Sequence, residues 1–399
     1  TTRLPATLWD PSSNTIFATF GSISTATTQA SYLQKTYSVT APSAASTLRL
    51  RFTLTSAGGT GKDFHIDRVH LNGGIPVTPP PPAPIVYATQ QTLVDGDTAE
   101  RIVEKAAKTL PRANQVTWQR MEHTYFIHFG VNTFRGVEWG TGYESPTVFN
   151  PTALDASQWV REIKQAGGKQ VMLVAKHHDG FCLWPSRYTA QDVASSSWLG
   201  GNGNVVKAVS EACQAQGIKF GVYVSPADLH QIHADETAGN PEGYYGNGSA
   251  VQSTTIPTDP ASFKSNPGTG RTPVPGFGPY TYQVNDYNRY FLNQLYELLT
   301  EYGPVHQVWF DGANPESGIS ETHDYVKWYD LIRKLRPDIV IGIGGADARW
   351  VGNESGAART TEWSVIPFSG DPATGGTAPD PTGTDLGSRA KLTLGSTLS

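Results

Sequence analysis

The sequence predicts an α/β fold, a TIM-type (β/α) barrel that is incomplete at its C-terminus, preceded by a small all-β, sandwich-like domain. From about residue 125 onward, short apolar runs alternate with amphipathic helical segments, which is typical of a parallel sheet with right-handed crossovers. Three of these apolar runs end in His or Asp residues, at the position where barrel enzymes carry their chemistry.

The N-terminal part shows strand patterns and no helical pattern. Residues 47–54 and 64–71 alternate apolar and polar side chains with a period of two, as half-buried strands do. A proline-rich stretch follows, and such a sequence forms a stiff, extended linker. We therefore expect a β-sandwich domain at 1–75, a linker at 76–88 and the barrel domain at 89–399.

The barrel domain contains strand and helix signals in alternation, with capping residues at the helix starts and Gly at most helix ends. The expected strands cover residues 125–131, 170–176, 219–224, 308–311, 339–343 and 363–366. The expected helices run from Asp97 (in a capping box with Glu100) to about Leu110, Asp155 to Gly167, Asn204 to Gly217, Asp286 to Gly303 and Asp324 to Leu335. Because six strands are found rather than eight, we expect the remaining strands to lie outside this chain. The segment 225–283, rich in Gly and Pro, is expected to be a long functional or disordered loop.

Composition limits the class of protein. The chain has 30 basic and 35 acidic residues, so it offers no electrostatic footprint for nucleic acid, and no apolar run is long enough to span a membrane. The two cysteines, Cys182 and Cys213, are expected to be buried free thiols. Abundant Gly, Pro and aromatic residues indicate a secreted or extracellular protein (periplasmic and cell-surface locations included), whose export signal we expect to have been removed or to lie outside this sequence.

Asp311 directly follows an apolar run and precedes a glycine, so it is expected at the C-terminal mouth of a strand. The alternative is that Asp311 only opens a turn. Two further runs favour a shared site, because one ends in His128 and the other in His177, His178 and Asp179.

A catalytic Asp311 suggests glycoside hydrolysis, which uses a second carboxyl group about 5 Å away in the retaining mechanism. The downstream candidates are Glu354, which lies on a Gly-flanked loop, and Glu362. A solvated loop glutamate is the alternative for Glu354.

The histidines could instead bind a metal ion. Adjacent histidines on a strand point to opposite faces, however, which makes a shared metal awkward unless a bulge intervenes, so hydrogen bonding to sugar hydroxyls is the better use. Burial in the core is the alternative for each histidine. Four tryptophans could offer their rings to a sugar, although any of them could equally belong to the core: Trp139, Trp184, Trp309 and Trp363.

Five motifs together resemble one enzyme family from about residue 90 to the C-terminus. They are His128-Phe129-Gly130, Glu138-Trp139-Gly140, the run from His177 to Pro185, Trp309-Phe310-Asp311-Gly312 and Trp350-Val351-Gly352-Asn353-Glu354. This set is similar to the family 29 glycoside hydrolases, the α-L-fucosidases, and its Glu-Trp-Gly and Trp-Val-Gly-Asn-Glu forms resemble the branch specific for α-1,3/1,4-linked fucose. The N-terminal strands resemble those of carbohydrate-binding modules.

The resemblance implies a retaining exo-glycosidase that acts on fucosylated oligosaccharides or glycans without a metal or other cofactor. It implies that Asp311 is the nucleophile and Glu354 the acid/base, and that Tyr223 lies near the nucleophile. The substrate-binding positions would be His128, Glu138, Trp139, His177, His178 and Trp309. The alternative is a non-catalytic carbohydrate-binding protein derived from such an enzyme.

Overall fold

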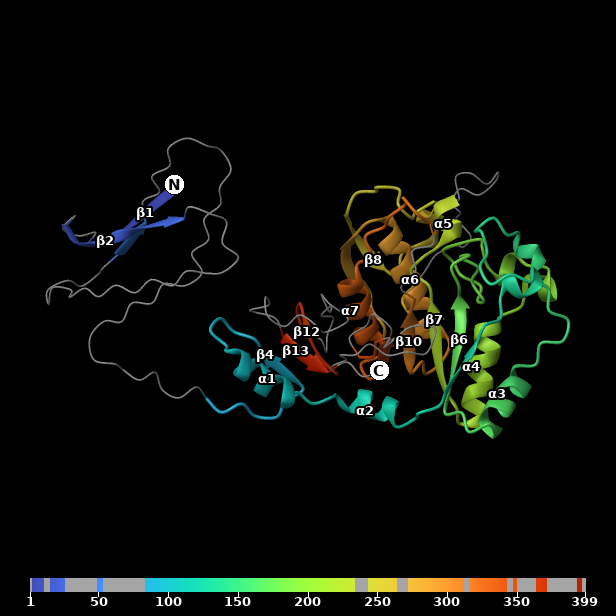
Figure 1. Ribbon diagram of the computed structural model, residues 1–399. Coiled ribbons are helices and arrows are strands. Elements are labelled where there is room, and N and C mark those ends of the chain that lie inside the picture. The colour runs from blue at the N-terminus through green and yellow to red at the C-terminus, as the bar shows by residue number, and fades with distance from the viewer. Residues whose placement is uncertain are drawn as a thin grey trace. The chain divides into compact units, whose positions relative to one another are not determined.

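The computed structural model of the chain forms two compact units, Thr1–Pro84 and Ile85–Ser399, and each is described by itself. Figure 1 shows the chain coloured from its N-terminus to its C-terminus, with the elements labelled. The structure describes residues 2–10, 15–25, 49–52, 83–233, 243–263, 272–311, 316–342, 347–349, 364–371 and 393–396.

The described part of the smaller unit contains three strands. They are β1 (Thr2–Asp10), β2 (Thr15–Thr25) and β3 (Arg49–Phe52). These strands form an antiparallel sheet in the order β2-β1-β3. Strand β3 falls within the predicted strand 47–54, whereas the predicted strand 64–71 and most of the linker lie outside the described residues. The sandwich architecture therefore stays a prediction.

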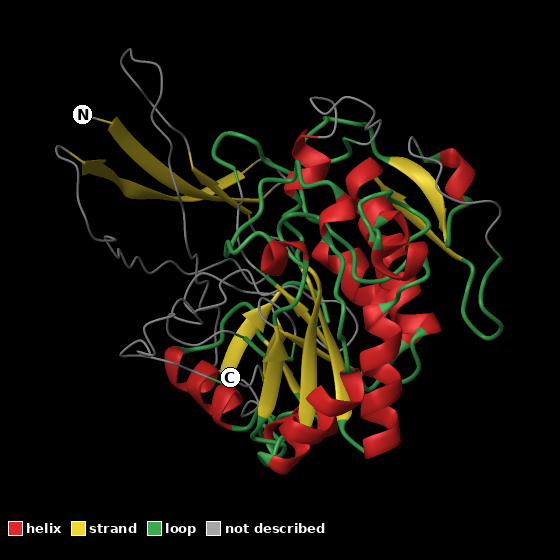
Figure 2. Ribbon diagram, turned by 90° about the vertical axis from the view of Figure 1, so that its right-hand side faces the viewer, coloured by secondary structure: helices red, strands yellow, loops and turns green. Residues whose placement is uncertain are grey.

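Five parallel strands form the central sheet of the larger unit, which Figure 2 shows with helices gathered around it. They are β5 (Thr124–Ile127), β6 (Gln170–Lys176), β7 (Lys219–Val224), β10 (Gln307–Phe310) and β11 (Val340–Gly342). Their order is β11-β10-β7-β6-β5, so each strand lies beside the preceding one of the series. In a doubly wound sheet the direction in which strands are added reverses at a switch point, whereas in a barrel each strand is added beside the preceding one. The observed strand order follows the barrel pattern. The α/β prediction is confirmed, and closure into a barrel stays a prediction.

The prediction of a sixth barrel strand at residues 363–366 was wrong. Strand β12 (Val365–Phe368) pairs antiparallel with β13 (Thr393–Ser396), which in turn pairs antiparallel with β4 (Gln90–Thr92). A small second core lies between this sheet and the first helix and contains Leu93, Ala106, Val365 and Leu394. A short apolar run indicates burial, but it does not indicate which strand will be its partner.

Helices α3 (Ala156–Gln165) and α4 (Val205–Gln216) contact each other, as do α6 (Asp286–Glu301) and α7 (Tyr325–Leu335), and α4 also contacts β6 and β7 (Figure 1). The α-helices are α1 (Ala99–Ala107), α2 (Ala113–Gln119), α3 (Ala156–Gln165), α4 (Val205–Gln216), α5 (Leu229–His233), α6 (Asp286–Glu301) and α7 (Tyr325–Leu335). Short 3₁₀ turns lie at Val131–Phe134, Pro146–Val148, Val193–Ser195, Trp198–Gly201 and Pro260–Ser262.

Alternation along β6 separates two apolar clusters. Val171 and Leu173 join the large core that includes side chains of the helices. Met172 and Val174 instead pack with Tyr223 of β7, and this second cluster lies on the opposite face of the sheet. The second face is the one that leads to the predicted site.

Most helix starts follow the predicted caps. The side chains of Asp155, Asn204 and Asp324 each accept a hydrogen bond from the backbone N–H three residues later, as N-caps do. Two predicted starts were wrong by one residue, because Thr98 rather than Asp97 caps α1 and Asn285 rather than Asp286 caps α6. Asp97 instead forms ion pairs with Arg101 and Lys105.

The segment 225–283 carries more regular structure than predicted. It contains α5 and an antiparallel pair formed by β8 (Gln252–Ile256) and β9 (Tyr280–Val284). The polar and glycine-rich sequence gave no signal for these short strands. In β9, Tyr280 and Tyr282 alternate with the exposed Thr281 and Gln283.

Cys182 and Cys213 are both buried free thiols, as predicted. No helix in the described ranges combines the length and the apolar character that crossing a membrane requires.

Candidate active site

The C-terminal ends of four adjacent strands bring together most of the predicted site residues. His128 follows β5, His177 and His178 follow β6, and Asp311 follows β10, while Tyr223 is the last residue but one of β7. Since parallel strands all end at the same edge of a sheet, these side chains converge there. The prediction that three strand ends deliver one group of side chains is confirmed by this arrangement.

Asp311 and Tyr223 are directly linked. The phenolic oxygen of Tyr223 donates a hydrogen bond of 2.6 Å to Oδ2 of Asp311. Burial raises the pKa of Tyr223 well above its usual value, and the neighbouring Asp311 carboxylate raises it further, so the phenol keeps its proton. The Asp311 side chain is 31% exposed, which leaves the carboxylate accessible to a ligand.

A bulge in β6 turns both neighbouring histidines toward the site. The pairing of β6 with β7 shifts between Val174 and Lys176, so the alternation of faces is broken at that point. Lys176 is buried and binds Asp228 at 2.9 Å, and the chain leaves the strand after it. The rings of His177 and His178 consequently lie 4.3 Å apart, which is the case of an intervening bulge that the sequence left open.

His178 lies between Asp311 and the end of β7. Its Nε2 is 3.6 Å from Oδ2 of Asp311, and its Nδ1 is 2.7 Å from Oγ of Ser225. The ring of Trp139 packs against it with a centroid distance of 4.8 Å. His177 in turn stacks on Tyr223, with ring centroids 5.8 Å apart and an angle of 19° between the planes. The imidazole groups are therefore held by packing on several sides.

Burial keeps the histidines of the site neutral. It is the main cause that lowers the pKa of His177 to about 4, and the neighbouring histidines lower it further. The pKa values of His128 and His178 are also lowered by burial, although the charge of Asp311 opposes the shift in both. A neutral imidazole carries one donor and one acceptor, which suits hydrogen bonding to hydroxyl groups.

The loop after β5 brings Glu138 and Trp139 to the same edge. Glu138 is exposed, and its charge acts on His128. Gly140 packs so closely on Asp179 that a Cβ atom at this position would lie 2.7 Å from the Asp179 Cβ. Asn132 holds the same carboxylate with a hydrogen bond of 2.9 Å. The close packing explains why the Glu-Trp-Gly motif needs its glycine.

One of the predicted tryptophans, Trp309, lies at the site, and another, Trp184, belongs to the core. Trp309 lies beside Met172, Val174 and Tyr223 on the site face of the sheet, and its ring meets that of Phe126 at 5.0 Å. Trp184 is fully buried, and its indole N–H donates to Glu297, so it belongs to the core rather than to a sugar-binding surface.

Three residues that the sequence singled out lie outside the described residues: Glu354, Glu362 and Trp363. The role predicted for Glu354 is therefore still a prediction.

Ser225 and Asp228 support the site and were not singled out from the sequence, whereas Asp179, which also supports it, was noted at the strand end but given no role. Ser225 contacts His178, Asp179 accepts from Asn132, and Asp228 balances the charge of Lys176. Burial is the main cause that raises the pKa of Asp179 to about 7. One signal could have identified Ser225, because it follows β7 in the same way that Asp311 follows β10.

The arrangement offers an accessible carboxylate, hydrogen-bonding imidazoles and aromatic surface at one edge of the sheet. Within the described ranges, no three His, Cys, Asp or Glu side chains are grouped closely enough to hold a metal ion. Such a site can bind a polyhydroxylated ring and present a nucleophile to it.

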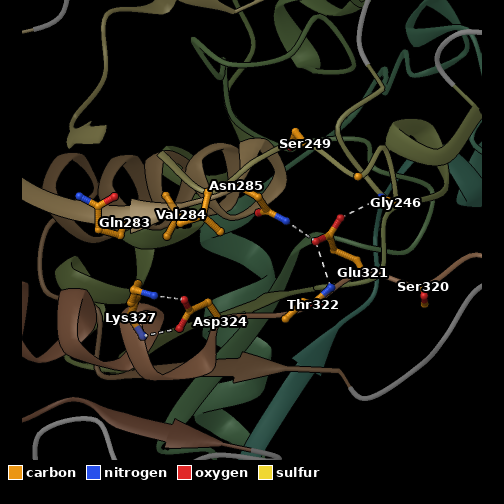
Figure 3. A pocket seen from close by; sticks show the side chains of 12 residues that line it. Gly246, Ser249, Gln283, Val284, Asn285, Ser320, Glu321, Thr322, Asp324 and Lys327 are labelled. Carbon is orange, nitrogen blue, oxygen red and sulfur yellow. Dashed lines mark hydrogen bonds and ion pairs between the residues drawn. The ribbon is translucent and has the colours of Figure 1, made fainter. Parts of the chain in front are cut away.

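A pocket of about 470 Å³ lies elsewhere in the unit, between the β8–β9 pair and the starts of α6 and α7. Figure 3 shows the Glu321 carboxylate inside it, already bonded to Asn285 and to the backbone of Gly246. None of the predicted site residues lines this pocket.

Comparison with known proteins agrees with this geometry. The family model for α-L-fucosidase matches residues 105–356. The chain is 38% identical over 258 residues to Alpha-L-fucosidase 1 of Arabidopsis thaliana, an alignment that covers 64% of this chain and 42% of the relative.

Two solved structures are also similar. A Bacteroides ovatus protein assigned as an α-L-fucosidase superposes with a TM-score of 0.56 at 42% identity, over 70% of this chain and 41% of that one. The Ruminococcus gnavus GH29 fucosidase in complex with fucose gives a TM-score of 0.50 at 28% identity, over 70% of this chain and 54% of that one. The chain thus spans about two fifths of the length of the Arabidopsis and B. ovatus proteins.

Proposed function

The chain belongs to the α-L-fucosidase family, and on this premise we propose that its larger unit hydrolyses α-L-fucosidic bonds. The observation that carries the proposal is the position of Asp311, an accessible carboxylate held by Tyr223 and faced by His178. Nucleophile, ring-binding imidazoles and aromatic surface are the parts that a glycosidase needs around the anomeric carbon.

We propose a retaining mechanism. Asp311 attacks the anomeric carbon and forms a glycosyl-enzyme, while Glu354 protonates the departing oxygen and then activates the water that releases fucose. The histidines and Glu138 bind the hydroxyls of the ring. Their hydrogen bonds accelerate the reaction to the extent that they strengthen as the ring flattens toward the transition state.

The proposed substrates are branched oligosaccharides or glycans with α-1,3/1,4-linked fucose. The Glu138-Trp139-Gly140 and Trp350 to Glu354 motifs support this branch of the family. We further propose that the N-terminal strands belong to a carbohydrate-binding module and that the protein works outside the cytoplasm, on the basis of strand pattern and composition. Rates on α-1,3/1,4-linked and α-1,2-linked fucosyl oligosaccharides test the linkage, and equal rates would contradict it.

Hydrolysis of 4-nitrophenyl α-L-fucoside tests the activity itself. The wild-type chain should release nitrophenol, and Asp311→Asn should reduce the rate by at least about a thousandfold, because the nucleophile is removed. Asp330→Asn is a matched control, since Asp330 also accepts a hydrogen bond from a buried tyrosine, Tyr282, but lies on α7 away from the site. Fucose binding without any nitrophenol release would instead indicate a non-catalytic carbohydrate-binding protein.

A further inference from the structure

Ser225 occupies a fixed position at the edge of the site. It directly follows β7, is fully buried, and its backbone N–H donates to the carbonyl of Lys176 at 3.0 Å. This bond belongs to the last pair of β6 and β7, Lys176 with Val224. The Ser225 hydroxyl is therefore placed beside the segment that carries His177 and His178.

The hydrogen bonds of Ser225 determine which nitrogen of His178 carries the proton. The Ser225 hydroxyl donates its single proton to the carbonyl of Ala227 at 2.6 Å. The same oxygen lies 2.7 Å from Nδ1 of His178 and has only lone pairs left for that contact. Nδ1 must then be the donor. Because burial lowers the pKa of His178, the ring is neutral and Nε2 keeps a free lone pair.

We propose that Ser225 is a positioning residue that fixes His178 in the Nδ1–H tautomer and so presents Nε2 as a hydrogen-bond acceptor for a substrate hydroxyl beside Asp311. This inference rests on the proposed function for the identity of the hydroxyl, which belongs to the fucose ring. The Nε2 atom is 3.6 Å from Oδ2 of Asp311, so the hydroxyl that it accepts lies next to the attacking carboxylate.

The other tautomer would work against the reaction. An Nε2–H group would donate toward Oδ2 of Asp311, which already accepts from Tyr223. A second donor would stabilise the free carboxylate and weaken it as a nucleophile, and the acceptor for the sugar hydroxyl would be lost as well. Ser225 thus affects both binding and chemistry without touching the substrate.

The tautomer can be observed directly in the unaltered protein. Nitrogen-15 NMR of the full chain with labelled histidine distinguishes the protonated from the unprotonated ring nitrogen, and His178→Gln identifies the signals by their disappearance. At pH 7 we expect a proton on Nδ1 of His178 and none on Nε2. A proton on Nε2, alone or together with Nδ1, would overturn the proposal whether or not the chain cleaves fucosides.

Substitution supplies the kinetic test. Ser225→Ala should move the His178 proton to Nε2 and lower kcat/KM on 4-nitrophenyl α-L-fucoside by about ten- to a hundredfold, because the buried Nδ1–H loses its acceptor. Ser225→Thr keeps the hydroxyl and should restore both the Nδ1–H signal and most of the activity. Ser210→Ala is the matched control, since Ser210 is also buried and donates to a backbone carbonyl, that of Tyr302, but on α4.

The outcomes separate this inference from the proposed function. Full activity in Ser225→Ala, with an active wild-type chain, overturns the role of Ser225 and leaves the fucosidase proposal intact. An inactive wild-type chain with the Nδ1–H tautomer contradicts the fucosidase proposal and supports the geometry of His178. If Ser225→Ala does not fold, the NMR measurement on the wild-type chain decides the question.

Discussion

The phenolic oxygen of Tyr223 and Oδ2 of Asp311 are joined by a 2.6 Å hydrogen bond that connects the neighbouring strands β7 and β10. This bond orients the carboxylate at the end of β10. It also places a proton donor that cannot ionise near neutral pH next to the proposed nucleophile, because the pKa of the phenol is raised by burial.

Replacing Tyr223 with Phe should weaken catalysis while leaving the fold intact. The change removes the hydrogen bond that orients the Asp311 carboxylate, so kcat/KM on 4-nitrophenyl α-L-fucoside should fall about ten- to a hundredfold, the equivalent of about 1.5–3 kcal/mol. Tyr282→Phe removes a similar bond of 2.8 Å to Asp330 and should leave kcat/KM unchanged. Equal activities of wild type and Tyr223→Phe would show that the bond does not serve the reaction.

Replacing Glu354 with Gln should affect substrates according to their leaving groups. In a natural glycan the leaving group is a sugar hydroxyl, which is a poor leaving group and needs a general acid to protonate it. Hydrolysis of such substrates should therefore slow by about a hundredfold or more. The first step with 4-nitrophenyl α-L-fucoside needs no such help and should slow far less. Glu362→Gln should hydrolyse both substrates at the wild-type rates. If Glu362→Gln instead slows glycan hydrolysis and Glu354→Gln does not, Glu362 is the acid/base.

Replacing Lys176 with Met should destabilise the larger unit. Lys176 and Asp228 form a fully buried ion pair at 2.9 Å, and the change leaves Asp228 buried without its counter-charge. The expected loss is about 3–5 kcal/mol in the free energy of unfolding, measured with urea. Lys207→Met, which breaks the exposed pair with Glu211, should cost under about 1 kcal/mol. Similar losses in both variants would contradict this explanation.

His323 should make stability depend on pH. Burial among aromatic rings lowers its pKa to about 4, whereas the unfolded chain protonates near 6.5. Between these values the unfolded state binds more protons, so the contribution of His323 to the free energy of unfolding is lost as the pH falls from 6.5 to 4. Urea unfolding at both pH values gives the decrease in the free energy of unfolding between pH 6.5 and pH 4. This decrease should be smaller in His323→Phe than in wild type by on the order of 1–3 kcal/mol. An identical loss in the two proteins would refute this.

The sequence was most informative where apolar runs are long or helix caps are strong. Strands β6 and β7 were predicted with their bounds, and Asn204 and Gly217 correctly marked the ends of α4, since Gly217 adopts the positive φ of 68° that a helix end favours. Strand β12 was misassigned because four apolar residues carry no information about the direction or partner of pairing.

The side chains of the site depend on features that a sequence does not show. The bulge between Val174 and Lys176 turns His177 toward the site, and periodicity cannot reveal such an irregularity. Ser225 and Asp228 were missed because each acts through another residue, His178 and Lys176 respectively. By contrast, Asp311 was singled out from its position at a strand end, together with two other apolar runs that also end in His or Asp residues.

The identity of the nucleophile is the central claim, and covalent trapping tests it most directly. A 2-deoxy-2-fluoro-α-L-fucosyl fluoride should inactivate the chain. The fluorine at C2 slows both formation and breakdown of the glycosyl-enzyme, whereas the reactive fluoride leaving group speeds formation only, so the intermediate accumulates. Mass spectrometry of the digested protein should then find one 2-fluorofucosyl group on the peptide that contains Asp311, attached to that residue. Attachment to any other residue, or turnover without a trapped intermediate, would contradict the account.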